Sequence, residues 1–266
     1  MKQPIVMFDD ENGNKRLSMP EQYGSHLTTL AYLYLQPNGW FEDLPCDVEG
    51  VTPWYTFPAV SFIKDILSKE SKVFEYGSGF STFFYNDYVG ETVSIEHDSV
   101  WYNKIKEQLP NAKIYLMEQN AGVHPEAVSL VTQFNEHFLQ VRSDNLEHDL
   151  KHGLVNNEFA GYASSIYGYP KGYFDVIVLD GMARSLCGVL AVERLDENGI
   201  IILDNSDRWH YNTLQKYLID KGYKRIDFWG PGYNNHKAWC TSIFAKNLSF
   251  KNNRLERKMV EGEIFG

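Results

Sequence analysis

The sequence predicts an α/β protein with a Rossmann-like, doubly wound sheet of about seven strands, mostly parallel and ending in an antiparallel C-terminal hairpin. From about residue 58 onward, strand-like and helix-like segments alternate, a pattern typical of a parallel sheet with helices on both faces. The runs at 176–179 and 200–203 contain only Val, Ile and Leu, as expected for strands buried on both sides. A short connection joins the last two strand-like segments, which indicates the hairpin.

Residues 1–53 are predicted to form a helical lead-in ahead of this domain. A helix start at Met19-Pro20-Glu21 is followed by apolar residues at helical spacing up to Tyr34, and Pro37-Asn38-Gly39 ends the pattern. A second apolar stripe over 58–67 predicts a helix that leads into the first strand of the sheet.

The domain itself is predicted over residues 54–250, and its elements follow from the spacing of apolar residues. Strands are expected at 72–76, 92–96, 112–117, 174–180, 199–204, 223–229 and 241–246. Helices are expected at 81–88, 100–109, 183–195 and 211–221. The charged tail at 251–266 is expected to be loosely ordered.

The alternation is interrupted over residues 118–173, a stretch too long for a plain connection. This insertion holds a helical segment at 125–138 and a piece rich in Tyr and Gly at 161–172. Ligands of open α/β sheets bind beyond the carboxyl ends of the strands. We therefore interpret the insertion as a partial lid over a substrate, with a simple surface decoration as the alternative.

Composition limits the classes of function. The chain of 266 residues has 43% apolar residues and a net charge of −10, which fits one domain with a real core and disfavours a nucleic-acid partner. We find neither a membrane span nor a signal peptide in it. Three cysteines lie far apart, which indicates a reducing compartment, so we expect a cytoplasmic protein. The oligomeric state is not indicated.

The first candidate site is a glycine turn between a strand and a helix. Glu75 is near the end of the strand, Gly77-Ser78-Gly79 forms the turn, and Ser81 and Thr82 open the helix. The glycines let a ligand approach the backbone, and the helix start suits a carboxylate, while the acid suits an amine. Methionine carries both groups. A dinucleotide fingerprint would place a third glycine at Thr82, which disfavours a nicotinamide-dependent oxidoreductase.

A second acid strengthens this prediction. Glu96 ends the next strand, 21 residues after Glu75, and an acid at about that distance is the expected partner of two ribose hydroxyls. The alternative is an exposed acid at a strand end. His97 follows at once and either lines an adenosine pocket or has a structural role.

In this order, the segments at 75–81, 94–101, 174–181 and 199–208 resemble the class I S-adenosylmethionine-dependent methyltransferases, and the resemblance extends over about residues 58–246. The chain most resembles the subgroup of glucuronoxylan methyltransferases and bacterial proteins related to them. Many members of that subgroup have a basic residue where this chain has Met182.

The resemblance implies S-adenosylmethionine as the cofactor and assigns roles by position. Glu75, Gly77 and Gly79 match the methionine-binding loop, Glu96 matches the ribose acid, and Asp180 matches the acid beside the reacting groups. The full set of cofactor-binding residues expected is Glu75, Tyr76, Gly77, Ser78, Gly79, Ser81, Glu96, His97 and Asp180.

The reacting centre is predicted where two strands end. Asp180 follows one strand, and Asp204 and Asn205 follow the next. Three such oxygen donors suit Mg²⁺ or Mn²⁺, and the arrangement resembles the metal site of catechol-type O-methyltransferases. A metal there would bind the acceptor oxygen; the alternative is that Asp204 and Asn205 only cap the loop.

Other residues near these strand ends are candidates for acid–base and acceptor roles. Without a metal, Asp180, Asp207 or His210 is the candidate general base, and we name Asp180, Asp204 and His210 as the catalytic set. Arg184 and Arg208 fit a carboxylate such as that of a uronic acid, or form surface ion pairs.

Together these observations predict a methyltransferase that acts on a hydroxyl of a sugar, a glycan or a small hydroxylated acceptor, with metal assistance as an option. A non-catalytic nucleoside-binding module of the same fold is the main alternative, and a nicotinamide-dependent oxidoreductase is a weaker one. Trp229, Tyr233 and Trp239 could stack on a ring-shaped acceptor or pack in the core.

Overall fold

The structure is a computed structural model that describes residues 6–9, 15–18, 53–109, 112–140, 157–232 and 235–247. Strands β1 (Val6–Asp9) and β2 (Lys15–Ser18) pair in antiparallel fashion as a small separate sheet. The predicted lead-in helix and the charged tail lie outside the described residues. No helix of the described part is long and apolar enough to cross a membrane.

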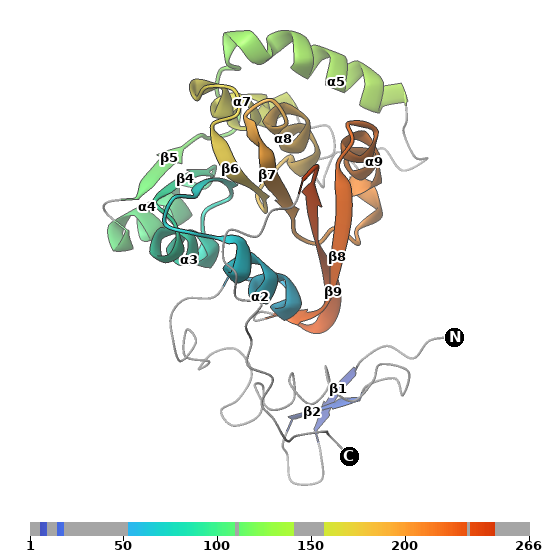
Figure 1. Ribbon diagram of the computed structural model, residues 1–266. Helices are drawn as coiled ribbons and strands as arrows, with labels where there is room; N and C mark the ends of the chain where they lie inside the picture. The colour runs from blue at the N-terminus through green and yellow to red at the C-terminus, as the bar shows by residue number, and fades with distance from the viewer. Residues whose placement is uncertain are drawn as a thin grey trace.

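A seven-stranded mixed sheet forms the centre of the domain (Figure 1). Its strands are β3 (Lys72–Tyr76), β4 (Glu91–Glu96), β5 (Lys113–Leu116), β6 (Phe174–Leu179), β7 (Leu195–Leu203), β8 (Lys224–Gly232) and β9 (Asn235–Ala245). The order across the sheet is β5-β4-β3-β6-β7-β9-β8. Strands β3 to β7 are parallel, and β9 runs antiparallel to both β7 and β8. The predicted Rossmann-like fold class is confirmed.

The helices of the described part are α2 (Phe57–Ile66), α3 (Phe80–Tyr88), α4 (Ser99–Gln108), α5 (Val128–Gln140), α7 (Ala160–Ser164), α8 (Arg184–Ala191) and α9 (Asn212–Asp220). Short 3₁₀ turns η1 (Pro125–Ala127), η2 (Asn157–Phe159), η3 (Ser165–Gly168) and η4 (Trp209–Tyr211) lie beside them. The predicted helix at 183–195 ends early, at Ala191. Leu195 instead pairs with Phe174 as the first residue of β7, so sheet pairing overrides the helical spacing.

Side chains that alternate along the strands build a core on each face of the sheet. Phe74 and Tyr76 belong to the cluster that includes α8 and α9, whereas Val73 belongs to the cluster that includes α2 and α3. This alternation is the two-residue period of a strand. Burial on both faces explains the continuous apolar runs in β6 and β7.

The described part of the insertion is joined to the first of these cores. Tyr162, Ala163 and Ile166 are fully buried in it, and α5 and α7 both contact α8 (Figure 1). Buried Arg194 pairs with Glu126 across 3.0 Å and so ties the insertion to the turn before β7. The role of the insertion as a lid stays a prediction.

Strand β3 lies between β4 and β6. The chain continues from β3 to β4 on one side and reaches β6 on the other side, so the strand order reverses at the carboxyl end of β3. Ligands of open α/β sheets bind at such a switch point. The fold therefore predicts a ligand site at the carboxyl ends of β3, β4 and β6.

Candidate functional site

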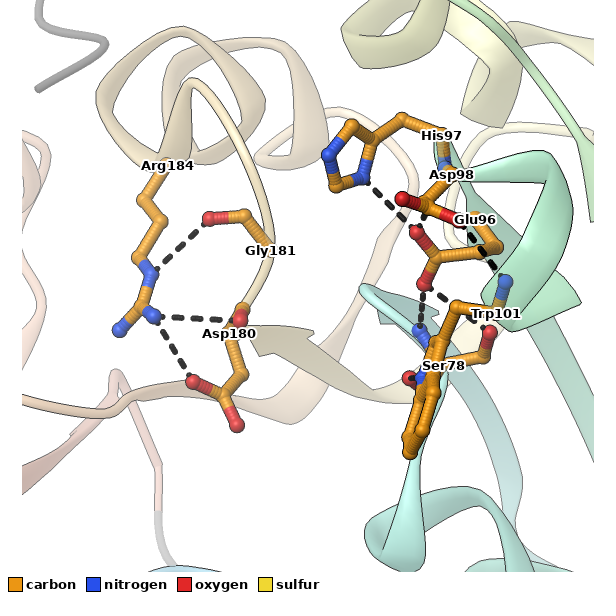
Figure 2. Close-up of polar contacts among 8 residues, drawn as sticks. All are labelled: Ser78, Glu96, His97, Asp98, Trp101, Asp180, Gly181 and Arg184. Atoms are coloured by element: carbon orange, nitrogen blue, oxygen red, sulfur yellow. Dashed lines mark hydrogen bonds and ion pairs between the residues drawn. The ribbon is translucent and has the colours of Figure 1, made fainter. Parts of the chain in front are cut away.

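A cavity of about 480 Å³ lies at the carboxyl ends of β3, β4 and β6, within the size range of small-molecule sites. Its lining residues are Trp54, Gly77, Ser78, Gly79, Phe80, Ser81, Glu96, His97, Asp98, Trp101, Asp180 and Gly181. Figure 2 shows two groups of polar side chains facing this region, one around Glu96 and one around Asp180. Most of the cofactor residues predicted from the sequence thus line this cavity.

The glycine turn after β3 is held by a second loop. Gly77 has a φ of +93°, and a Cβ added to it would lie 2.7 Å from the Cα of Gly181. The turns that follow β3 and β6 therefore touch at their backbones. At Gly79, by contrast, an added Cβ would meet nothing within 4 Å, so this glycine leaves open space beside the cavity.

Glu75 and Tyr76 do not line the cavity. The Oε2 atom of Glu75 accepts hydrogen bonds from Thr82 (2.6 Å) and Ser94 (2.8 Å), and burial raises the pKa of this carboxyl to about 7. Thr82 also accepts a hydrogen bond from the Gly79 amide at 2.8 Å, so Glu75 supports the turn from behind. The Tyr76 hydroxyl points into the core and donates to the Ala163 carbonyl at 2.7 Å.

Glu96 is 3% exposed, and donors surround its carboxylate (Figure 2). Its Oε2 atom accepts from the amide (3.0 Å) and the hydroxyl (3.1 Å) of Ser78. Its Oε1 atom accepts from the amides of His97 (2.8 Å) and Asp98 (2.9 Å). Burial alone would raise the pKa of Glu96, but donors from His97 and Asp98 outweigh burial and lower it. The group is therefore a permanent anion at neutral pH.

His97 joins this group through its ring. The Nδ1 atom lies 2.8 Å from Oε1 of Glu96 as an ion pair, and this contact raises the pKa of His97 in spite of partial burial. The ring also packs edge-on against Phe159 of the insertion at 5.5 Å.

Aromatic side chains that were not among the predicted site residues also line the cavity. Trp54 stacks on Phe80 with ring centroids 5.1 Å apart and remains 40% exposed. Trp101 donates its indole N–H to the Ser78 carbonyl at 2.7 Å. Trp101 was detectable as the third residue after Asp98, whose side chain caps α4. Trp54 carries no local signal, because long-range pairing of Thr56 with Gly232 brings this segment to the site.

Asp180 is held at the cavity by Arg184 (Figure 2). The guanidinium lies 2.9 Å from Oδ1 of Asp180 and donates to the carbonyls of Asp204 (2.6 Å) and Gly181 (3.1 Å). Desolvation raises the pKa of Asp180 to about 7, against the effect of Arg184 and with a further contribution from Asp204. Because Arg184 already bonds to these groups, its predicted role in binding an acceptor carboxylate would require it to release one of them.

The metal site predicted on Asp180, Asp204 and Asn205 is not supported. The buried Asp204 turns its Oδ1 atom into the core, where it accepts from Trp239 (2.9 Å) and Thr241 (2.6 Å). Arg184 contacts Asp180 and the main chain of Asp204. Its positively charged guanidinium therefore occupies the place that a bound metal ion would need. Within the described residues, no group of three or more His, Cys, Asp and Glu side chains could hold a metal ion. These residues do not fit Mg²⁺ or Mn²⁺.

The remaining candidates lie outside the cavity wall. His210 is buried in η4 with its ring against Tyr211, at a centroid distance of 4.3 Å. Asp207 is exposed and accepts from the Cys240 amide at 3.1 Å. Arg208 is exposed and lies close enough to Asp180 to lower its pKa. Trp239 is a core residue, Trp229 is exposed, and Tyr233 lies outside the described residues.

Comparison with protein-family models and with curated proteins finds no match for this sequence. Solved structures of similar fold include a precorrin-6y C5,15-methyltransferase from Geobacter metallireducens GS-15, at 15% identity over 71% of this chain and 86% of that one, with a TM-score of 0.44. A SAM-dependent methyltransferase from Aquifex aeolicus has 10% identity over 76% and 92%, with a TM-score of 0.41.

A spermidine synthase from Thermotoga maritima is also similar, at 12% identity over 92% of this chain and 69% of that one, with a TM-score of 0.39. Likenesses this distant do not decide between activities. The function must therefore be inferred from the residues of the cavity.

Proposed function

We propose that this chain is an S-adenosylmethionine-dependent methyltransferase that acts on a hydroxyl group of a sugar, a glycan or a small hydroxylated acceptor. One observation carries the proposal: Glu96 and Asp180 line the same cavity, with the turn from Gly77 to Ser81 also in its wall. One acid that is ionised at neutral pH, Glu96, and one acid whose pKa is raised to about 7, Asp180, thus line the site of one ligand.

The lining residues suit the parts of this cofactor. Glu96 would accept hydrogen bonds from the ribose hydroxyls, and the first turn of α3 would offer main-chain N–H groups to the amino-acid carboxylate. Trp101 and His97 flank Glu96 with flat rings, which suit the adenine base. Glu75 would act through Thr82 and the glycine turn, because its carboxylate is behind the wall.

Asp180, which lines the cavity apart from Glu96 (Figure 2), is the candidate general base. When bound, the cofactor supplies a methyl group on a positively charged sulfur. Asp180 would accept the proton that an acceptor hydroxyl loses as its oxygen is methylated, and a pKa of about 7 suits that task at neutral pH. Arg184 fixes the orientation of the carboxylate, and positioning of this kind supplies much of the rate in displacement reactions.

Arg208 indicates the charge of the acceptor. It is exposed, and its charge acts on Asp180. A guanidinium there would pair with a carboxylate of the acceptor, as in a uronic acid.

Calorimetric titration with S-adenosylhomocysteine tests the binding step. We expect micromolar affinity, and a wild-type protein that gives no heat would exclude the proposal. Incubation with methyl-labelled cofactor and a panel of hydroxylated sugars and phenols, with and without EDTA, tests the transfer. Binding without any transfer would favour the nucleoside-binding module.

The nicotinamide alternative is tested by comparing thermal shifts with NADH and S-adenosylhomocysteine. We expect a shift only with the latter. Thr82, at the position of the third glycine, uses its hydroxyl to join Glu75 to the turn, which does not suit a dinucleotide pyrophosphate.

A further inference from the structure

Groups of the protein already occupy the acceptor positions of the Glu96 carboxylate. Its Oε2 atom accepts two hydrogen bonds, both from Ser78. Its Oε1 atom accepts hydrogen bonds from the amides of His97 and Asp98 and also contacts the His97 ring. A carboxylate offers about four lone-pair positions. A ligand that binds Glu96 must therefore replace a donor that is present.

The donors fall into two kinds. The amides of Ser78, His97 and Asp98 belong to the backbone of the glycine turn and of the segment after β4, so they cannot leave without moving that backbone. The Ser78 hydroxyl and the His97 imidazole can leave by rotation of one side chain. Each carboxylate oxygen thus has one replaceable partner: the Ser78 hydroxyl, which donates to Oε2, and the His97 ring, which forms an ion pair with Oε1.

Both replaceable groups belong to residues of the cavity wall, since Ser78, Glu96 and His97 all line it (Figure 2). A pair of neighbouring hydroxyls, such as the 2′ and 3′ hydroxyls of a ribose, offers one donor to each oxygen of a carboxylate. The number and the placement of the replaceable donors match that pair.

We infer that the Ser78 hydroxyl and the His97 ring hold the Glu96 carboxylate in place of a ribose diol and are displaced when the nucleoside binds. The inference rests on the proposed function and deepens it, because it makes Ser78 and His97 residues that set the affinity for a diol. Removing either donor removes a competitor of the ligand, so such a variant gains affinity for a diol and gains none for a ligand without hydroxyls.

Calorimetry with two ligands tests this inference. S-adenosylhomocysteine carries the diol, and its 2′,3′-dideoxy analogue lacks it. We expect Ser78→Ala to bind S-adenosylhomocysteine about three- to tenfold more tightly than wild type, because a hydrogen bond to a charged group need no longer be given up. Its affinity for the dideoxy analogue should be unchanged.

A matched control is available at the other buried acid. Ser94→Ala removes a serine hydroxyl from Glu75, which does not line the cavity, and should show no difference that depends on the diol. His97→Phe keeps an aromatic ring beside Phe159 and removes the donor to Oε1. It should repeat the Ser78→Ala pattern, and it keeps the test decisive if Ser78→Ala does not fold.

The outcomes are distinct. Weaker binding of S-adenosylhomocysteine by Ser78→Ala and His97→Phe, or an equal change for both ligands, overturns the inference and makes these donors supports of Glu96. Wild-type protein that binds neither ligand overturns the proposed function, and the inference with it. A gain confined to the diol supports both.

Discussion

At the scale of single residues, two acids of one cavity are set to different protonation states by their neighbours. Glu96 accepts amide and side-chain donors at both oxygens, and its pKa is lowered. Asp180 has one ion-pair partner, Arg184, and desolvation raises its pKa to about 7. Hydrogen bonds to the charged form and loss of solvent are opposite effects on a carboxylate. The first acid is suited to hold hydroxyls and the second to move a proton.

Glu96→Ala should weaken the binding of S-adenosylhomocysteine by about 100-fold, since two charge-assisted hydrogen bonds to the ribose are lost. Calorimetric titration measures the effect. Glu91→Gln is the control, because Glu91 is at the other end of β4 and pairs with Lys113 and Tyr173. Equal affinity of Glu96→Ala and wild type would remove the ribose assignment.

Asp180→Asn should lower kcat by about 10²- to 10⁴-fold, the usual contribution of a general base. In the wild type, only the ionised carboxylate accepts a proton, so kcat should rise with pH through about 7 and then level off. The rate of methyl transfer is measured from pH 5.5 to 9 and should show this rise. The residual rate of Asp180→Asn should not rise with pH in the same range. A wild-type profile that is flat across this range would exclude Asp180 as the base.

At the scale of elements, the sequence predicts well where side-chain spacing is local. Every predicted strand from Lys72 onward is present, and in β6 and β7 burial on both faces imposes continuous apolar runs. The end of α8 was predicted wrongly, since pairing of Leu195 with Phe174 depends on residues distant in sequence. The same reason hid Trp54, which reaches the cavity through pairing of Thr56 with Gly232.

The candidate site was predictable as a set of positions but less so as a set of contacts. Spacing placed Gly77, Glu96 and Asp180 together, and the cavity contains all three. Spacing could not show that Arg184 enters the ends of β6 and β7 in place of a cation. Nor could it show that Asp204 turns toward Trp239.

The two glycines of the turn after β3 should respond differently to alanine. Gly79→Ala places its methyl group in open space, so the melting temperature should stay within about 2 °C of wild type while affinity for S-adenosylhomocysteine falls at least about tenfold. Gly77→Ala has a strained φ of +93° and a clash with Gly181, so it should lose about 2 kcal/mol or more of stability. Thermal unfolding and calorimetry of both variants check this. Unchanged affinity of Gly79→Ala would place the ligand elsewhere.

At the scale of the whole molecule, the ends of β3, β6 and β7 hold buried or partly buried acids that the fold does not favour in their charged form. Glu75, Asp180 and Asp204 all have raised pKa values, with desolvation as the largest cause. Groups of this kind are typical of functional sites. The arrangement links the stability of the entire domain to pH.

Glu75 gives the sharpest form of this link. Its pKa is raised from 4.5 to about 7 in the folded state, so the folded protein holds a proton that the unfolded chain releases at lower pH. The resulting stabilisation is fully present below about pH 4.5 and is lost as the pH rises through about 7, with a total of about 3 kcal/mol. The free energy of unfolding of the wild type should therefore fall between pH 5 and pH 8.

Glu75→Gln removes the titrating group and keeps an oxygen to accept from Thr82 and Ser94. Urea unfolding at pH 5 and pH 8 should show a smaller fall in the free energy of unfolding for Glu75→Gln than for wild type, by about 2–3 kcal/mol. Glu70→Gln, at an exposed acid before β3, is the control and should behave as wild type. A wild type and a Glu75→Gln variant with the same dependence on pH would mean that Glu75 ionises in the fold as it does in the unfolded chain.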